Sequence, residues 1–278
     1  MIVDAHHHLW DPALADYSWM TDEVAPIRRR FGTDDLAPLL QAHGVEGTVV
    51  VQACGSIDET RWLLDIASST PFVRGVVGWV DLTDPDVREV LAELGGGCLV
   101  GIRHQVHDEA DTDWLLRPDV QRGIAAVGDA GLAYDFLVRA RELPAALETA
   151  RRQPDVRFVV DHLAKPSLRG GPTEAWARGL EALSALDNVS CKLSGLVTEA
   201  DWGGWRPEEL TPYFQRALEW FGPDRSLFGS DWPVCLLAAD YGAVLDLVLA
   251  ALDGLTDDER DAVLGGNATR VYGLDSNG

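Results

Sequence analysis

The sequence predicts an α/β protein folded as a single (β/α)8 barrel of the TIM type, regular or distorted, over residues 1–278. Eight short apolar segments rich in β-forming residues alternate with helical patterns, and parallel strands need helical crossovers of this kind. Several segments, such as 48–51 (TVVV) and 158–160 (FVV), are apolar at consecutive positions, as is typical of strands buried on both faces. Eight such units in 278 residues fit one barrel domain.

The elements are expected in a regular order. Strands are expected at 2–5, 47–52, 73–80, 99–104, 133–138, 157–163, 189–194 and 226–231. Helices are expected between them at 33–44, 58–68, 84–94, 118–130, 142–153, 173–186 and 207–221, and after the last strand at 241–252 and 257–264. Thr33 is the expected N-cap of the first helix because acids follow it, and Gly44 is its expected end.

A doubly wound open sheet is the alternative fold for the same alternation of strands and helices. That fold carries a Gly-rich phosphate-binding turn after its first strand, whereas this chain has His6, His7 and His8 there. Neither Gly-x-Gly-x-x-Gly nor a P-loop occurs anywhere in the sequence. The barrel is therefore preferred.

Composition limits the classes of partner. The net charge of -22 opposes nucleic-acid binding, because phosphate contacts need a basic face. Cys54, Cys98, Cys191 and Cys235 lie far apart without a Cys-x-x-Cys pair, which favours a reducing compartment over a disulfide framework or a cysteine zinc site. The sequence shows no basic leader and no apolar run of the roughly 20 residues that a membrane span needs. We expect a cytoplasmic protein without membrane or nucleic-acid partners, and its assembly is open between a monomer and a homodimer.

Residues that carry chemistry are expected at the carboxyl ends of the strands, where barrel enzymes place their active sites. His6 and His8 are two residues apart, so both side chains point to one face of the first strand, and two imidazoles there indicate a cation site. His162 and Asp231 end the sixth and eighth strands, whereas His7 faces the other way and is expected to be structural. The other polar residues at strand ends are Gln52, Arg103, His104, Asp135, Asp161, Lys192 and Ser194.

Six motifs occur in order along the predicted strands: 3–10 (VDAHHHLW), 78–81 (GWVD), 101–104 (GIRH), 161–166 (DHLAKP), 191–195 (CKLSG) and 228–233 (FGSDWP). Together they resemble the amidohydrolase superfamily, and within it the branch of sugar-acid lactonases of the L-fuconolactonase and L-rhamnonolactonase types. That branch is related to pyrone-dicarboxylate lactonase. The resemblance extends from residue 2 to about Tyr272, where 267–270 (NATR) also fits.

The resemblance implies hydrolysis of a lactone ester to a hydroxy acid, with His6, His8, His162 and Asp231 as the catalytic cluster. Asp231 is the expected general base, because a carboxylate beside histidines or a metal stays ionised. His6, His8 and Asp231 are the expected ligands of one divalent metal ion, zinc by preference. In a mechanism without metal, protonated histidines and Arg103 would stabilise the developing oxyanion instead.

Substrate-binding residues are expected around this cluster. Arg103, Lys165 and Lys192 would hold the carboxylate or hydroxyls of a sugar acid, with ion pairs to Asp161 or Asp135 as the alternative. Tryptophan rings on loops at the same end would pack on a sugar or cap the barrel. These rings are Trp10, Trp19, Trp202, Trp205 and Trp232. The residues expected to contact substrate are Arg103, His104, Lys165, Lys192, Gln52, Trp10 and Trp232.

The chain departs from the dinuclear members of the superfamily, which carry a lysine on the fourth strand and a histidine on the fifth. It has Arg103 and His104 at the first position and Asp135 at the second, so a second metal ion is not expected. Asp135 also counts against the decarboxylases of a sister branch, and the intact catalytic set counts against an inactive sugar-binding barrel. Decarboxylation and hydrolysis of a pyrone-dicarboxylate-like lactone are kept as alternative functions.

Overall fold

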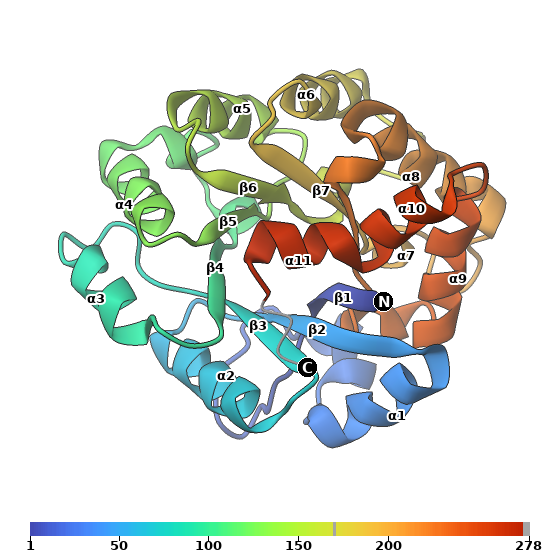
Figure 1. The fold of residues 1–278 in the computed structure, drawn as a ribbon, viewed down its shortest axis with the longest axis horizontal. Helices are drawn as coiled ribbons and strands as arrows, with labels where there is room; N and C mark the ends of the chain where they lie inside the picture. Colours follow the sequence, from blue (N-terminus) through green and yellow to red (C-terminus); the bar gives the residue numbers. More distant parts are fainter. Residues whose placement is uncertain (169–170, 275–278) are drawn as a thin grey trace.

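The computed structural model describes residues 1–168 and 171–274. In this part of the chain, eight parallel strands form one sheet whose order follows the sequence. The ring closes where the backbone N–H of His8 donates to Trp232 (2.6 Å) and that of Asp231 donates to His6 (2.8 Å). This arrangement confirms the predicted (β/α)8 barrel (Figure 1). The strands are β1 (Ile2–His7), β2 (Val45–Val51), β3 (Val73–Gly78), β4 (Leu99–His104), β5 (Ala133–Phe136), β6 (Arg157–Val160), β7 (Val189–Leu193) and β8 (Ser226–Phe228).

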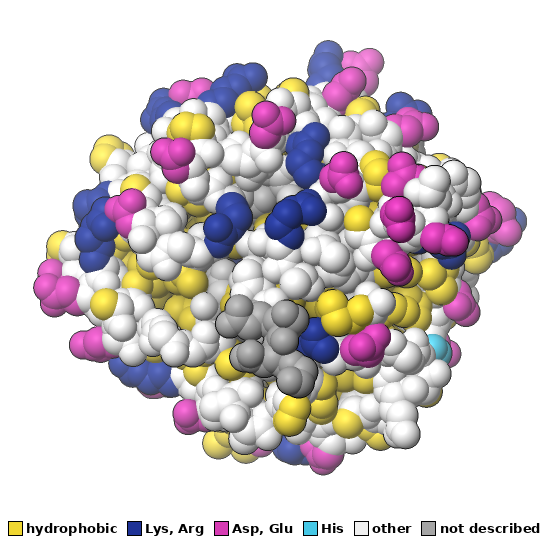
Figure 2. Space-filling view, viewed as in Figure 1, with side chains coloured by type: hydrophobic (Ala, Val, Ile, Leu, Met, Phe, Trp, Pro, Cys, Tyr) yellow, Lys and Arg dark blue, Asp and Glu magenta, His cyan; other side chains and the backbone are white. Residues whose placement is uncertain are grey.

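Helices surround the ring of strands, and the last helix lies across it (Figure 1). They are α1 (Thr33–His43), α2 (Ile57–Ser69), α3 (Val87–Leu94), α4 (Pro118–Asp129), α5 (Leu143–Arg152), α6 (Glu174–Ser184), α7 (Leu196–Glu199), α8 (Pro207–Phe221), α9 (Tyr241–Ala251), α10 (Asp257–Asp261) and α11 (Asn267–Tyr272). In the described residues, no helix is both long and apolar enough to cross a membrane. Acidic and basic side chains are intermingled on the face shown in Figure 2.

Local sequence signals explain where the helices begin and end. Ser56 caps α2 by accepting the backbone N–H of Glu59, and Gly44 ends α1 in the left-handed conformation (φ 66°), as predicted. The predicted N-cap of α1 is one residue late. Gly32 occupies that position, and its backbone N–H donates to the carboxylate of Asp35 at 2.9 Å, so Thr33 is already helical.

Several predicted boundaries are wrong in ways that affect the site. β6 ends at Val160 and β8 at Phe228, so the polar residues after each lie on turns instead of in the strands. α3 begins at Val87, three residues later than predicted, and α7 and α11 were not predicted. Hydrophobic pattern alone extends a strand into any following apolar residues, even where the backbone has already turned.

Two apolar clusters pack on the two faces of the sheet. The inner one fills the barrel with alternate strand residues such as Val3, Val49 and Val77, and α11 closes it with Val271 and Tyr272. The larger, outer cluster joins the strands to the surrounding helices. Because α11 closes one end of the barrel, the polar side chains gather at the opposite end, where the strands have their carboxyl termini.

Candidate active site

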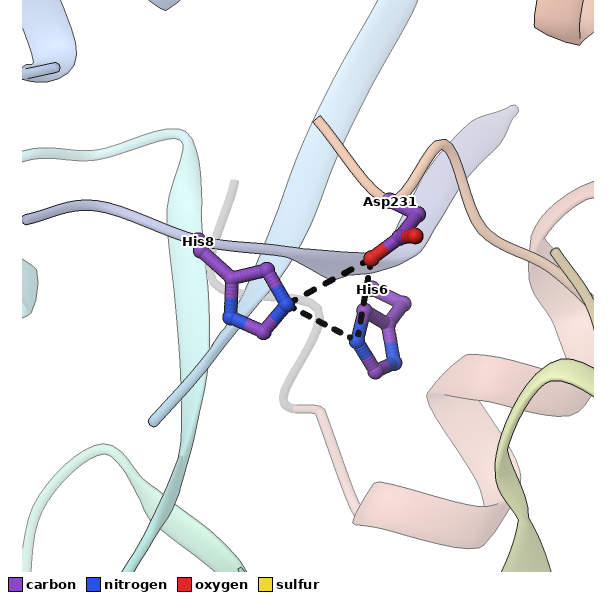
Figure 3. Close-up of side chains that lie close together, drawn as sticks. All are labelled: His6, His8 and Asp231. Atoms are coloured by element: carbon purple, nitrogen blue, oxygen red, sulfur yellow. Dashed lines mark hydrogen bonds and ion pairs between the residues drawn. The ribbon is translucent and has the colours of Figure 1, made fainter. Parts of the chain in front are cut away.

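Two histidines and one aspartate from the joined ends of the ring converge on a single point (Figure 3). The Nε2 atoms of His6 and His8 are 3.2 Å apart. Asp231 Oδ1 lies 3.8 Å from Nε2 of His6 and 3.5 Å from Nε2 of His8. All three residues are buried. Residues separated by more than 220 positions therefore form one compact donor set, as the strand-end argument predicts.

Hydrogen bonds hold this end of β1 in place. Nδ1 of His8 lies 2.8 Å from the carbonyl oxygen of Val51 and must carry a proton, so neutral His8 presents the lone pair of Nε2 to the cluster. The buried carboxylate of Asp4 accepts the backbone N–H of His6 (3.1 Å) and that of Ser230 (2.9 Å), which ties β1 to the segment after β8. Burial raises the pKa of Asp4 to about 6, although these donors oppose the shift.

His7 takes the structural role expected of it. Its side chain is fully buried, and its Nε2 lies 2.9 Å from Thr48 Oγ1 on β2. It therefore points away from the two histidines that flank it, as the alternation of a strand requires.

The donor set fits a small divalent cation. With zinc–ligand distances near 2.0–2.2 Å, the ligand atoms of a tetrahedral site are about 3.3 Å apart, close to the spacing of these three atoms. Imidazole nitrogen and carboxylate oxygen are ordinary zinc ligands, and three protein ligands leave one position for water or substrate.

A second donor group in the described residues, formed by His6, Asp161 and His162, shares a ligand with the first. It is already neutralised, because Lys192 Nζ lies 2.9 Å and Arg103 Nη1 lies 3.0 Å from the Asp161 carboxylate. Repulsion from these two cations opposes a second metal ion there.

His162 reaches the cluster through a turn of unusual handedness. Four consecutive residues after β6 have left-handed φ values: His162 (53°), Leu163 (54°), Ala164 (56°) and Lys165 (47°). Non-glycine residues adopt this conformation at a cost of roughly 1–2 kcal/mol each. The turn is held by the Lys165 backbone N–H on the His162 carbonyl (2.8 Å) and by the Trp176 indole N–H on the Leu163 carbonyl (2.7 Å).

The turn brings the imidazole of His162 next to the carboxylate of Asp231. Its Nε2 lies 3.7 Å from Asp231 Oδ1, and its Nδ1 lies 2.8 Å from Ser194 Oγ. A Cβ atom at Gly195 would approach Nδ1 to 2.4 Å, so glycine is needed at this position to make room for the ring.

Burial sets the protonation states of the cluster. It lowers the pKa of His6 and of His162 well below the ordinary histidine value, against the opposing attraction of Asp161 and Asp231, respectively. Burial also opposes ionisation of Asp231, but the neighbouring His162 and His8 outweigh it, so the pKa of Asp231 falls below its usual value. At neutral pH His6 and His162 are therefore neutral, and the Asp231 carboxylate is ionised.

Buried ion pairs dominate the base of the site. Lys192 is fully buried, with Nζ 2.6 Å from Asp135 Oδ2 and 2.9 Å from Asp161 Oδ1. Arg103 pairs with Asp161 at 3.0 Å. Lys192 therefore forms the ion pairs that were the alternative to substrate binding, and none of its surface is exposed to a substrate. Arg103 makes an ion pair and also borders the pocket.

A pocket of about 170 Å³ opens above the cluster. Its polar lining includes His8, Arg103, His162, Lys165 and Asp231, all of which were predicted as site residues. Lys165 is also paired with Glu199 at 2.8 Å. The loop tryptophan that borders the pocket is Trp19. Lining residues that the sequence did not indicate are Ala53, Gln105, His107, Asp108, Leu137 and Val234.

The remaining predicted substrate-binding residues lie outside this pocket. Trp10 and Trp232 are fully buried and both stack edge-on against Phe31, with ring centroids 5.7 and 5.4 Å away. They cap the barrel, which was the stated alternative. Gln52 is fully buried and donates to the carbonyl of Arg103 at 3.2 Å. His104 is stacked on Trp114 at 4.1 Å and bonded to Glu109 at 2.8 Å.

A (β/α)8 barrel with a His-x-His pair on its first strand, a histidine after the sixth and an aspartate after the eighth defines an amidohydrolase. The chain belongs to the amidohydrolase family, whose model matches residues 3–274.

The curated relatives include lactonases. The chain is 45% identical to L-fucono-1,5-lactonase of Burkholderia ambifaria over 280 residues, which cover 98% of this chain and 96% of the relative. It is 41% identical to L-fucono-1,5-lactonase of Burkholderia multivorans over 283 residues, with the same coverage. The crystal structure of a Burkholderia multivorans amidohydrolase with bound zinc matches with a TM-score of 0.95 at 40% identity, covering 99% of this chain and all of the other.

Proposed function

We propose that this protein is a lactonase that opens the ring ester of a sugar-acid lactone, L-fucono-1,5-lactone or a close analogue, to give the hydroxy acid. The relatives named L-fucono-1,5-lactonase support the substrate class. The observation that carries the proposal is the ionised Asp231 carboxylate, which lies within 3.8 Å of three imidazoles beneath a pocket. This is the donor set that ester hydrolysis by water requires.

Asp231 is the proton acceptor in this proposal. Its contacts with the three imidazoles all involve Oδ1, which leaves Oδ2 to take a proton from the attacking water. His6, His8 and Asp231 would hold zinc, the ion bound in the related crystal structure. When bound, the metal supplies Lewis-acid polarisation of the carbonyl and lowers the pKa of a water ligand.

The cationic side chains of the pocket would orient the lactone. Arg103 on β4 and Lys165 on the turn after β6 border the pocket and can donate to the ring hydroxyls and to the carboxylate of the product. The apolar side chains of Leu137 and Val234 line the same space and would contact the less polar face of the substrate.

The test is a pH-indicator assay of the purified protein with a panel of aldonolactones that includes L-fucono- and L-rhamnonolactone. It would be run on the protein as isolated, after chelation and after zinc reloading. We expect turnover above the spontaneous rate, highest for L-fuconolactone. Hydrolysis of a pyrone dicarboxylate alone, or release of CO2 from a hydroxybenzoate alone, would establish an alternative function and overturn the proposal.

A cytoplasmic location and a monomeric or dimeric state stay predictions. Cell fractionation and light scattering of the purified protein would measure them.

A further inference from the structure

The helix that closes the far end of the barrel carries a tyrosine whose hydroxyl reaches the buried ion pairs. Tyr272 is the last residue of α11, the helix that lies across the ring of strands in Figure 1. Its ring belongs to the inner apolar cluster, and only 3% of the residue is exposed. Its hydroxyl lies 3.0 Å from Oδ1 and 2.8 Å from Oδ2 of Asp135 on β5 and donates to this carboxylate.

From Asp135 the polar contacts continue to a candidate metal ligand. Lys192 on β7 donates to Asp135 Oδ2 at 2.6 Å and pairs with Asp161 Oδ1 at 2.9 Å, and this Asp161 oxygen lies 3.3 Å from Nδ1 of His6 on β1. The chain of contacts therefore joins α11, β5, β7 and β1 across the interior of the barrel. These side chains are buried, so water does not replace a missing partner.

We propose that Tyr272 is a positioning residue of the active site, acting through Asp135, Lys192 and Asp161 on the orientation of His6. The inference depends on the proposed zinc site and lactonase activity. The partner of the second ring nitrogen fixes the tautomer and orientation of a metal-binding histidine. With Nε2 of His6 on the metal, Nδ1 carries the proton and faces Asp161 Oδ1 at 3.3 Å, and Lys192 holds this same oxygen at 2.9 Å. Without the hydroxyl of Tyr272, Asp135 can rotate and no longer holds the ammonium group of Lys192 against Asp161, the partner of His6. Tyr272 does not border the pocket of Asp231, so substrate binding does not depend on it directly.

Tyr272→Phe removes the hydroxyl and keeps the ring. We expect zinc affinity, measured by chelator competition without substrate, to fall about tenfold, the lower end of the range for outer partners of metal-bound histidines. The kcat for the lactone should fall by a similar factor, with KM changed by less than about twofold because the pocket is intact. Tyr134→Phe is the matched control. Tyr134 is a buried phenol beside Asp135 on β5 whose hydroxyl has no hydrogen-bond partner among the described residues, so wild-type values are expected.

Asp135→Asn tests the proposed route. If Tyr272 acts through Asp135, adding Tyr272→Phe to the Asp135→Asn protein should change zinc affinity and kcat by less than about twofold. Fully additive effects, or a Tyr272→Phe enzyme with wild-type zinc affinity and kcat, would overturn the positioning role alone. A wild-type protein that binds no zinc and opens no lactone would overturn the proposed function and this inference with it.

Discussion

Replacing Lys192 with methionine tests the buried ion pairs directly. Lys192 and Arg103 face Asp135 and Asp161 in a fully buried group of two cations and two carboxylates, so its charges balance. Methionine has a similar length and no charge, so Lys192→Met fills the space but leaves one negative charge unmatched. The unfolded state is affected far less, because water solvates its charges.

The expected loss of stability is large. Removing one partner from a buried ion pair costs about 3–5 kcal/mol, a substantial part of the roughly 5–15 kcal/mol by which a domain is stable. For a protein of this size, that loss lowers the melting temperature by roughly 6–20 °C. Asp135→Asn combined with Lys192→Met removes one charge of each sign, so the double variant should recover at least half of the lost stability.

Urea denaturation followed by fluorescence measures both free energies of unfolding. A Lys192→Met protein whose free energy of unfolding lies within about 1 kcal/mol of the wild-type value would refute the role of charge balance, as would a double variant that is no more stable than the single one. Unchanged stability with a raised KM would instead support the earlier expectation that Lys192 binds substrate.

Three further predictions follow from the site. Asp231→Asn keeps the shape of the side chain but removes the proton acceptor, so kcat should fall about 10²–10⁴-fold in steady-state assays while the circular dichroism spectrum is unchanged; near-wild-type turnover would exclude Asp231 as the base. Elemental analysis after dialysis against zinc should find at most one ion per chain. Two ions, both needed for activity, would contradict the prediction that Arg103 and Asp135 leave no site for a second metal ion. Burial, and after it repulsion from Lys165, lowers the pKa of His107 from 6.5 to about 4. Below pH 6.5 the unfolded state therefore takes up a proton that the folded state does not, and stability is lost as the pH falls toward 4. His107→Gln should remove up to about 3 kcal/mol of this loss in urea titrations at pH 7 and 4.5, and an equal acid sensitivity in both proteins would refute this assignment.

The central part of the site could be predicted because it depends on strand order and strand period alone. His6 and His8 share a face by the two-residue period, and the fold places the segment after β8 beside β1, so Asp231 must be near. Both inferences need only the sequence of elements.

The rest depends on distances across the barrel that no local pattern contains. The sequence offers Asp135 and Asp161 as ion-pair partners of Lys192, but no local pattern decides between these pairs and a role in substrate binding. Trp10 was assigned to the substrate because it lies on a loop, yet its indole N–H is bonded to the carbonyl of Arg29 at 2.9 Å within the cap of the barrel. The sequence predicts a strand through His162 because apolar residues stand before and after Asp161 and His162. Such features are decided by tertiary packing.

The left-handed turn after β6 also determines which amino acids this loop can accept. A glycine substitution usually lowers the stability of a protein because it raises the conformational entropy of the unfolded chain. Ala164→Gly would instead remove a steric cost of roughly 1–2 kcal/mol from the folded state. Valine or isoleucine at Leu163 or Ala164 would carry the largest penalty, because a branched Cβ clashes with the backbone in this region. Functional variants of this loop should therefore be rich in glycine and asparagine and poor in β-branched residues. Backbone handedness limits the sequence here even where a side chain touches no substrate.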